Sequence, residues 1–163
     1  MCLIVDNNVV RRVFGLEPAP DFDDLRKALF TLSDTPIRLV YESQLLREYV
    51  TYEKVRLLLL ELSRLGRVRR VPDAPIQAEM QILQAEKHYT SDDPHILALA
   101  RVENIRLLCS EDTALRADFL NRQIIDNGRG FLYDHPRHNH LLRIHCGVHL
   151  KAKPKQPRTP KKR

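Results

Sequence analysis

Several residue types are scarce in this chain of 163 residues, and each absence excludes a class of protein. There is no Trp and there are only five Gly, which argues against an all-β fold rich in tight turns. The three Cys form no CxxC pair, so we expect reduced thiols in a cytoplasmic protein and no disulfide framework. The longest apolar block, Leu57–Leu60, is far too short for the roughly 20 residues of a membrane span, and no basic leader precedes the first apolar run.

Basic charge is concentrated in the last part of the chain, KAKPKQPRTPKKR. This segment, residues 151–163, holds seven Lys and Arg, three Pro and no acid. Residues 1–150 hold 20 Lys and Arg against 21 Asp and Glu, a net charge of −1 compared with +6 for the whole chain. We therefore predict one domain, residues 1–150, and a disordered basic tail, residues 151–163. The tail is expected to contact nucleic-acid phosphates without reading sequence, and a solubilising tail without a partner is the alternative.

Short apolar runs alternate with helix-like segments along the predicted domain. Strands are predicted at residues 1–5, 36–41, 105–110 and 129–134, and helices at residues 21–32, 43–65, 74–89, 93–104 and 115–123, with Ser43 as the expected N-cap of the second helix. Residues 7–15 are a short helix or turn, residues 66–71 a loop or short edge element, and residues 138–150 either helix or strand. The alternation predicts an α/β fold with three layers, in which helices flank a central, mostly parallel sheet.

Acidic residues occur where the predicted strands end and where their helices begin. Asp6 and Asp112 each follow a strand, Glu48 lies early in the helix after the second strand, and Asp93 opens the helix that leads into the third. Ligands of such sheets bind outside the carboxyl ends of the strands, so these four carboxylates are expected on one rim. Clustered carboxylates repel one another, and a hard cation such as Mg²⁺ relieves this and supports phosphodiester cleavage.

Each of these acids also has an interpretation without chemistry. Asp6 fits a turn residue at a strand end, and Glu48 fits a solvated acid on a helix face. Asp93 before Pro94 fits a helix N-cap, and Asp112 fits the cap of the next helix. A capping carboxylate keeps a second oxygen for a metal, so the two roles do not exclude each other. Expected co-location on one rim is what favours a functional interpretation of the set.

Four short segments resemble, in order, the motifs of the PIN-domain family of metal-dependent nucleases, and together they cover roughly residues 1–133. The first motif is similar to LIVDNNVV, a strand followed by Asp-x-Asn. The second is similar to SQLLREY, a Ser-led helix that carries Glu, and the third to DDPHILALA, Asp before an Ala-rich helix. The fourth is similar to IRLLCSEDTAL, a strand that ends in Thr or Ser, one variable residue and Asp.

The resemblance implies that Asp6, Glu48, Asp93 and Asp112 bind Mg²⁺ or Mn²⁺ for the cleavage of single-stranded RNA by an endoribonuclease. Asn8 and Ser110 would brace the acids by side-chain hydrogen bonds. Many bacterial members of the family are VapC-type toxins, held inactive by an antitoxin protein that fills the acidic groove, and such members are often homodimers. We prefer Asp93 to its neighbour because its distance from ILALA matches the family pattern; the remaining candidates are Asp92 as the alternative ligand and Asp118 as an accessory acid or a surface residue.

Two other functions stay open at this point. One is a related nuclease that acts on structured RNA or DNA, in RNA processing or defence. The other is a catalytically silent PIN-like module that binds RNA. The His-rich residues 135–149 suggest zinc through His145, Cys146 and His149, but no known finger spacing matches, and RNA contact or a solvated surface are the alternatives.

Overall fold

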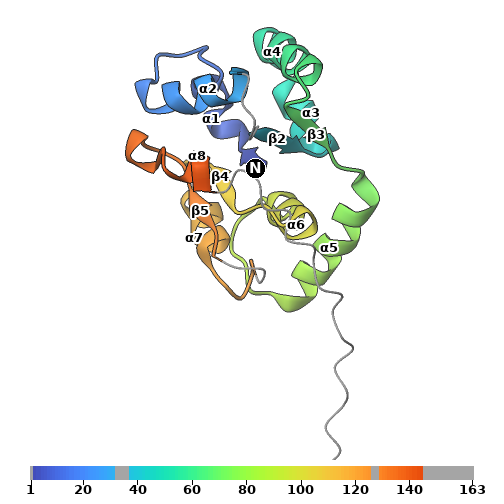
Figure 1. The fold of residues 1–163 in the computed structure, drawn as a ribbon. Helices are drawn as coiled ribbons and strands as arrows, with labels where there is room; N and C mark the ends of the chain where they lie inside the picture. Colours follow the sequence, from blue (N-terminus) through green and yellow to red (C-terminus); the bar gives the residue numbers. More distant parts are fainter. Residues whose placement is uncertain (1, 32–36, 126–128, 145–163) are drawn as a thin grey trace, which may run out of the picture.

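The computed structural model describes residues 2–31, 37–125 and 129–144. Within these residues, five strands form one sheet in the order β3-β2-β1-β4-β5, and all pairings are parallel (Figure 1). The strands are β1 Cys2–Val5, β2 Arg38–Tyr41, β3 Val68–Arg70, β4 Leu107–Cys109 and β5 Phe131–Leu132. The predicted α/β class, with helices that flank a central parallel sheet, is confirmed.

Helices connect successive strands and cover the sheet. They are α1 Asn7–Val13, α2 Asp23–Phe30, α3 Ser43–Tyr49, α4 Glu53–Arg64, α5 Asp73–Glu86, α6 Pro94–Glu103, α7 Thr113–Leu120 and α8 Leu141–Ile144, with 3₁₀ turns η1 Pro20–Phe22 and η2 Pro136–His138. α5 packs along α6, and α1 contacts both α2 and α3 (Figure 1). None of the helices in the described part of the chain has the length and apolar character needed to cross a membrane.

The two central strands are apolar on both faces, as a covered parallel sheet requires. In β1 the side chains of Leu3, Ile4 and Val5 are fully buried, and all of β4 is equally buried. By contrast, β3 lies at the edge of the sheet and exposes Arg69 and Arg70, which protects that edge from pairing with another chain. The alternatives for residues 66–71 are thereby resolved in favour of a short edge strand.

The helix predicted over residues 43–65 is wrong, because the chain turns in its middle. α3 ends at Tyr49 and α4 begins at Glu53. The Thr51 hydroxyl donates to the carbonyl of Glu48 at 2.7 Å, and Tyr49 is fully buried against the sheet. Apolar residues recur at helical spacing on both sides of the break, so periodicity alone did not reveal it.

The expected N-cap of α3 is also corrected. Ser43 is the first residue of the helix, and the cap is Glu42, whose carboxylate accepts from the backbone N–H groups of Gln44 at 2.5 Å and Leu45 at 2.7 Å. Glu42 is 5% exposed, so both oxygens are used inside the protein. The predicted tail, residues 151–163, lies outside the described residues.

Candidate functional site

Asp6 follows β1 directly and is held at the centre of the sheet edge. Its backbone N–H donates to the carbonyl of Cys109 at 2.8 Å, which places it beside the end of β4. The Ser110 hydroxyl donates to Asp6 Oδ2 at 2.6 Å, and both side chains are buried. Burial raises the pKa of Asp6, and the negative charge of Asp93 raises this pKa further.

Ser110 is the organising hydroxyl of this edge. While it donates to Asp6, its oxygen accepts from the backbone N–H of Asp112 at 3.0 Å and from Asn8 Nδ2 at 3.4 Å. One donated and two accepted hydrogen bonds use the full capacity of a hydroxyl group. Ser110 therefore fixes three predicted site residues, which agrees with the bracing role expected for it.

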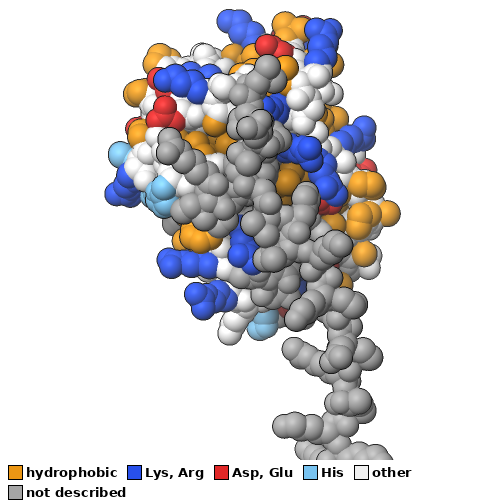
Figure 2. All heavy atoms as spheres, in the orientation of Figure 1, with side chains coloured by type: hydrophobic (Ala, Val, Ile, Leu, Met, Phe, Trp, Pro, Cys, Tyr) orange, Lys and Arg blue, Asp and Glu red, His pale blue; other side chains and the backbone are white. Residues whose placement is uncertain are grey.

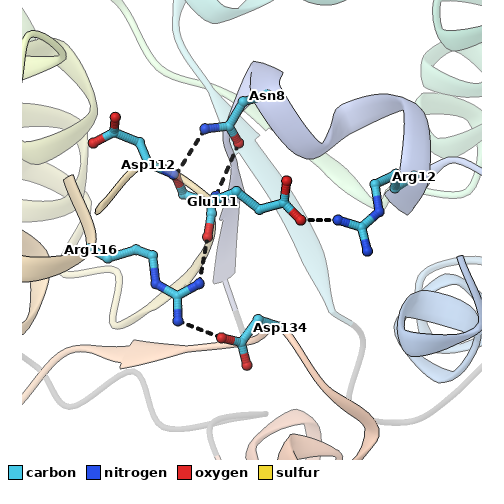
Figure 3. A network of polar contacts seen from close by, with 7 residues as sticks. Asn8, Arg12, Glu111, Asp112, Arg116 and Asp134 are labelled. Carbon is cyan, nitrogen blue, oxygen red and sulfur yellow. Dashed lines mark hydrogen bonds and ion pairs between the residues drawn. The ribbon is translucent and has the colours of Figure 1, made fainter. Parts of the chain in front are cut away.

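Asn8 acts differently from the expectation. Its side chain donates to Ser110 and accepts from the backbone N–H of Glu111 at 3.2 Å, so it joins α1 to the loop after β4 (Figure 3). Of Asn7 and Asn8, it is the backbone N–H groups that act on the carboxylate of Asp6, and they lower its pKa. Asn8 thus reaches Asp6 through Ser110, and the predicted direct side-chain bond to Asp6 is not among its contacts.

Glu48 is brought to the same edge by its neighbour on α3. The hydroxyl of Tyr49 donates to the carbonyl of Val5, the residue before Asp6, so α3 is tied to the end of β1. Burial raises the pKa of Glu48, and the charges of Asp93 and Asp6 raise it as well, while His95 and a hydrogen bond from Gln44 lower it. The sequence-based prediction did not include Tyr49, although an aromatic residue next to a candidate acid on a short helix was the available signal.

Asp93 lies at the N-cap position of α6, but its side chain does not cap the helix. Its backbone N–H donates to Ser91 Oγ at 3.0 Å, and its Oδ1 lies 3.9 Å from Nδ1 of the buried His95. Asp92 is exposed, whereas Asp93 is half-buried and its charge acts on both Asp6 and Glu48. We call Asp6, Glu48 and Asp93, which come from three different elements, the acid rim.

Asp112 joins this region through its backbone more than through its carboxylate. Its N–H donates to Ser110, and its Oδ1 caps α7 by accepting from the backbone N–H of Leu115 at 2.5 Å. In Figure 3 its carboxylate points away from Glu111 and Arg12. The capping interpretation is therefore confirmed, and one carboxylate oxygen is already engaged.

Asp118 is neither a surface residue nor free to act as an accessory ligand. It is 5% exposed and accepts from the backbone N–H groups of Thr90 at 2.8 Å and Ser91 at 2.7 Å, and from the Thr90 hydroxyl at 3.3 Å. The surface interpretation is wrong because α7 turns this side chain inward onto the loop before α6. Asp118 instead anchors the segment that delivers Asp93.

Two arginines flank the loop after β4 (Figure 3). Arg12 of α1 pairs with Glu111, and Arg116 of α7 pairs with Asp134 at 2.5 Å and donates to the carbonyl of Ser110 at 3.3 Å. Each pair is partly exposed, so each contributes at most about 1 kcal/mol to stability. Their position places positive charge on both sides of Ser110.

The acid rim fits a hydrated hard cation better than a closed cage of ligands. In the described ranges, no three His, Cys, Asp or Glu side chains approach one another as a ready-made metal site. Mg²⁺, however, usually binds one or two carboxylates and keeps several waters. Two buried atoms beside the rim, Asn7 Oδ1 and His95 Nε2, have no hydrogen-bond partner in the described structure. A bound water or ion is one of the explanations for orphaned buried polar atoms of this kind.

The described part of the His-rich segment makes local contacts. His135 accepts from the backbone N–H of Arg137 at 3.1 Å, His138 lies 3.0 Å from Asp134, and His140 contacts the carbonyl of Arg137. His145, Cys146 and His149 lie outside the described residues, so the zinc hypothesis remains a prediction. The Leu141–Ile144 stretch is helical, which settles the first part of residues 138–150.

The chain has few detectable similarities to known proteins. No family model matches the chain, and no curated protein matches it. Among solved structures, the chain is similar to one described as the crystal structure of VapBC2 from Rickettsia felis bound to a DNA fragment from their promoter. The identity is 15%, the TM-score is 0.49, and the alignment covers 82% of this chain and 100% of that chain. A likeness this distant leaves the function to be argued from the chain's own residues.

Proposed function

We propose that this protein is a Mg²⁺- or Mn²⁺-dependent endoribonuclease of the PIN type. The observation that carries the proposal is the environment of Asp6. This buried carboxylate accepts a hydrogen bond from the Ser110 hydroxyl, and the negative charge of Asp93 raises its pKa. A buried carboxylate with a second negative charge nearby costs stability unless a cation neutralises it. Such a cation can also serve the hydrolysis of a phosphodiester.

In this proposal the acid rim holds the cation, with Asp112 as a further carboxylate at its side. The bound ion would activate water and stabilise the leaving oxygen of a phosphodiester. Ser110 keeps the carboxylate of Asp6 in one orientation. Glu48 would contribute its carboxylate to the cation from α3.

Positive charge outside the rim supports a nucleic-acid substrate. The face drawn in Figure 2 carries Lys and Arg side chains spread around its outline, with Asp and Glu visible in fewer places. Arg12 and Arg116 lie next to the candidate site, where they pair with Glu111 and Asp134. The finer parts of the proposal are RNA as the substrate, an antitoxin protein as the inhibitor and a toxin function, as in the VapC-type proteins that the sequence resembles.

Cleavage assays on purified full-length protein test this function. Labelled single-stranded RNA, structured RNA and DNA are incubated with Mg²⁺, with Mn²⁺ and with EDTA. We expect metal-dependent cleavage of RNA that Asp6→Asn and Asp93→Asn each reduce at least about 100-fold, since each removes a metal ligand. The matched control is Asp92→Asn, because this neighbouring acid is exposed, and it should cleave like the parent.

The other outcomes separate the alternatives. Equal cleavage by the parent and both rim variants would refute the proposal, and RNA binding without cleavage would favour the catalytically silent module. Preference for structured RNA or DNA would favour the processing or defence nuclease. Growth arrest on expression that an adjacent small open reading frame relieves would support the toxin assignment.

A further inference from the structure

An arginine stands at the start of four of the five described strands. Parallel strands all begin at one edge of a sheet, so these residues lie along the edge opposite the acid rim (Figure 1). One is the first residue of β2, and the others precede β3, β4 and β5 by one or two residues. We call this set the arginine edge: Arg38, Arg67, Arg106 and Arg129.

Backbone pairing fixes the spacing of the arginine edge. The carbonyl of Arg67 accepts from the backbone N–H of Leu39 at 2.8 Å, and the carbonyl of Arg106 accepts from the backbone N–H of Phe131 at 2.7 Å. Between these two pairs of strands lies β1, which pairs with β2 on one side and with β4 on the other. Neighbouring strands are about 4.8 Å apart, so the arginine edge spans roughly 20 Å.

Acids follow the same strands that these arginines precede. Asp6 follows β1, and Glu42, Glu111 and Asp134 come within two residues of the ends of β2, β4 and β5. None of the residues that directly flank the four arginines in the sequence is acidic. The sheet therefore has a negative carboxyl edge and a positive amino edge. A polyanion that the acid rim repels is attracted to the opposite edge.

Only part of this positive charge serves the fold. Arg67 is 3% exposed, and its Nη2 donates to the carbonyl of Thr31, after α2, at 2.7 Å, while its Nη1 has no partner in the described structure. Arg38 and Arg129 are exposed, and their side chains make no hydrogen bond or ion pair with any described residue. Two guanidinium groups, one on each side of β1, are thus free for a ligand.

We infer that the arginine edge binds the phosphate backbone of single-stranded RNA, as a second contact surface opposite the acid rim. A guanidinium group matches a phosphate through parallel N–H donors. The apolar neighbours of the arginines in the chain, Ile37, Ile105 and Leu107, are buried, so this edge offers charge without the apolar core that a protein interface uses. The choice of RNA rests on the proposed function, whereas the surface itself does not depend on the metal site.

The test is the binding of a fluorescein-labelled, single-stranded RNA to full-length protein. Fluorescence anisotropy is read in EDTA, which prevents metal-dependent cleavage, over a series of salt concentrations. Each phosphate contact to a single strand contributes about 0.7 to the slope of log affinity against log salt. In the double variant Arg38→Gln/Arg129→Gln the magnitude of this slope should fall by about 1.4, and the affinity in about 0.1 M salt should fall roughly 10-fold.

Two control proteins make the result specific. The double variant Arg38→Lys/Arg129→Lys keeps both charges and should keep the slope. Lys54→Gln removes an exposed cation from the first turn of α4, roughly 15 Å along the helix from its last residue, and should leave slope and affinity unchanged. The basic tail is the same in every protein, so its contribution cancels from the differences. Thermal unfolding followed by circular dichroism confirms that each variant is folded.

The outcomes separate this inference from the proposed function. An unchanged slope and affinity in the double Gln variant overturn the inference, and so does an equal loss in the double Lys variant. Binding of a polyglutamate peptide in place of RNA, lost in the double Gln variant, would identify an acidic protein partner and overturn it as well. RNA binding through the arginine edge without cleavage supports the inference and removes the nuclease, whereas metal-dependent cleavage with unchanged RNA binding does the opposite.

Discussion

Asp6 and Asp118 are equally buried, each 5% exposed, yet they lie in opposite kinds of environment. Asp118 accepts three hydrogen bonds from Thr90 and Ser91, so the protein itself satisfies the carboxylate. Asp6 accepts from the Ser110 hydroxyl, but burial and the nearby charge of Asp93 raise its pKa. Burial alone therefore does not distinguish the two acids. They differ in how far the protein itself compensates the negative charge of the carboxylate.

The two regions are nevertheless connected. Asp118 holds Thr90 and Ser91, and Ser91 Oγ accepts from the backbone N–H of Asp93. The satisfied acid thus fixes the loop that carries a member of the acid rim. We expect substitutions in the Asp118 region to act on stability first, and substitutions in the Asp6 region to act on activity first.

The largest effect on stability is expected from Asp118→Asn. Both backbone N–H groups bond to Oδ2 and the Thr90 hydroxyl bonds to Oδ1, so an amide oxygen in the place of Oδ2 keeps the two backbone bonds but loses the negative charge that strengthens them. We expect the free energy of unfolding to fall by about 2 kcal/mol, measured by urea denaturation. Thr90→Val removes only the weaker hydroxyl contact and should cost about 1 kcal/mol. Equal stability of Asp118→Asn and the parent would contradict the anchoring role.

Ser110→Ala should show the reverse balance. It removes the hydroxyl that orients Asp6 and receives Asp112, so we expect cleavage to fall roughly 10- to 100-fold, as when a supporting group of a metal site is lost. Ser110→Thr keeps the hydroxyl and should retain most of the activity. If both variants cleave equally, the hydroxyl has no part in ordering the site.

A smaller effect, opposite in sign, is expected for Asp6→Asn without metal. Because the pKa of Asp6 is raised in the folded protein, its contribution to stability is complete below the ordinary carboxyl pKa near 3.8 and is lost as the pH rises through the folded-state value. The variant does not suffer this loss. In EDTA at neutral pH it should therefore be more stable than the parent by on the order of 1 kcal/mol.

Urea unfolding in EDTA at several values of pH above 4 measures this difference. The advantage of Asp6→Asn should grow with pH and then level off, and Mg²⁺ or Mn²⁺ should stabilise the parent alone. A variant less stable than the parent at every pH would show that Asp6 is a structural acid like Asp118.

Much of this architecture could be predicted from the sequence, because strand-like apolar runs and following acids are local signals. The parallel sheet, the position of Asp6 after β1 and the helix after Asp93 all follow from such signals. The break after Tyr49 and the inward turn of Asp118 could not be predicted, since each depends on contacts with residues distant in the chain. The same holds for His95, whose unpartnered nitrogen is visible only once α6 is packed.

The cap of α3 gives the smallest effect and tests the one local correction. The carboxylate of Glu42 accepts from two backbone N–H groups at the helix start, whereas the hydroxyl of Ser43 contacts the side chains of Arg70, at 3.0 Å, and Asp73. Glu42→Gln keeps one acceptor and loses the charge, so it should cost about 1 kcal/mol, while Ser43→Ala should cost less than about 0.5 kcal/mol. Urea denaturation measures both. A larger loss of stability in Ser43→Ala than in Glu42→Gln would contradict the assignment of Glu42 as the cap.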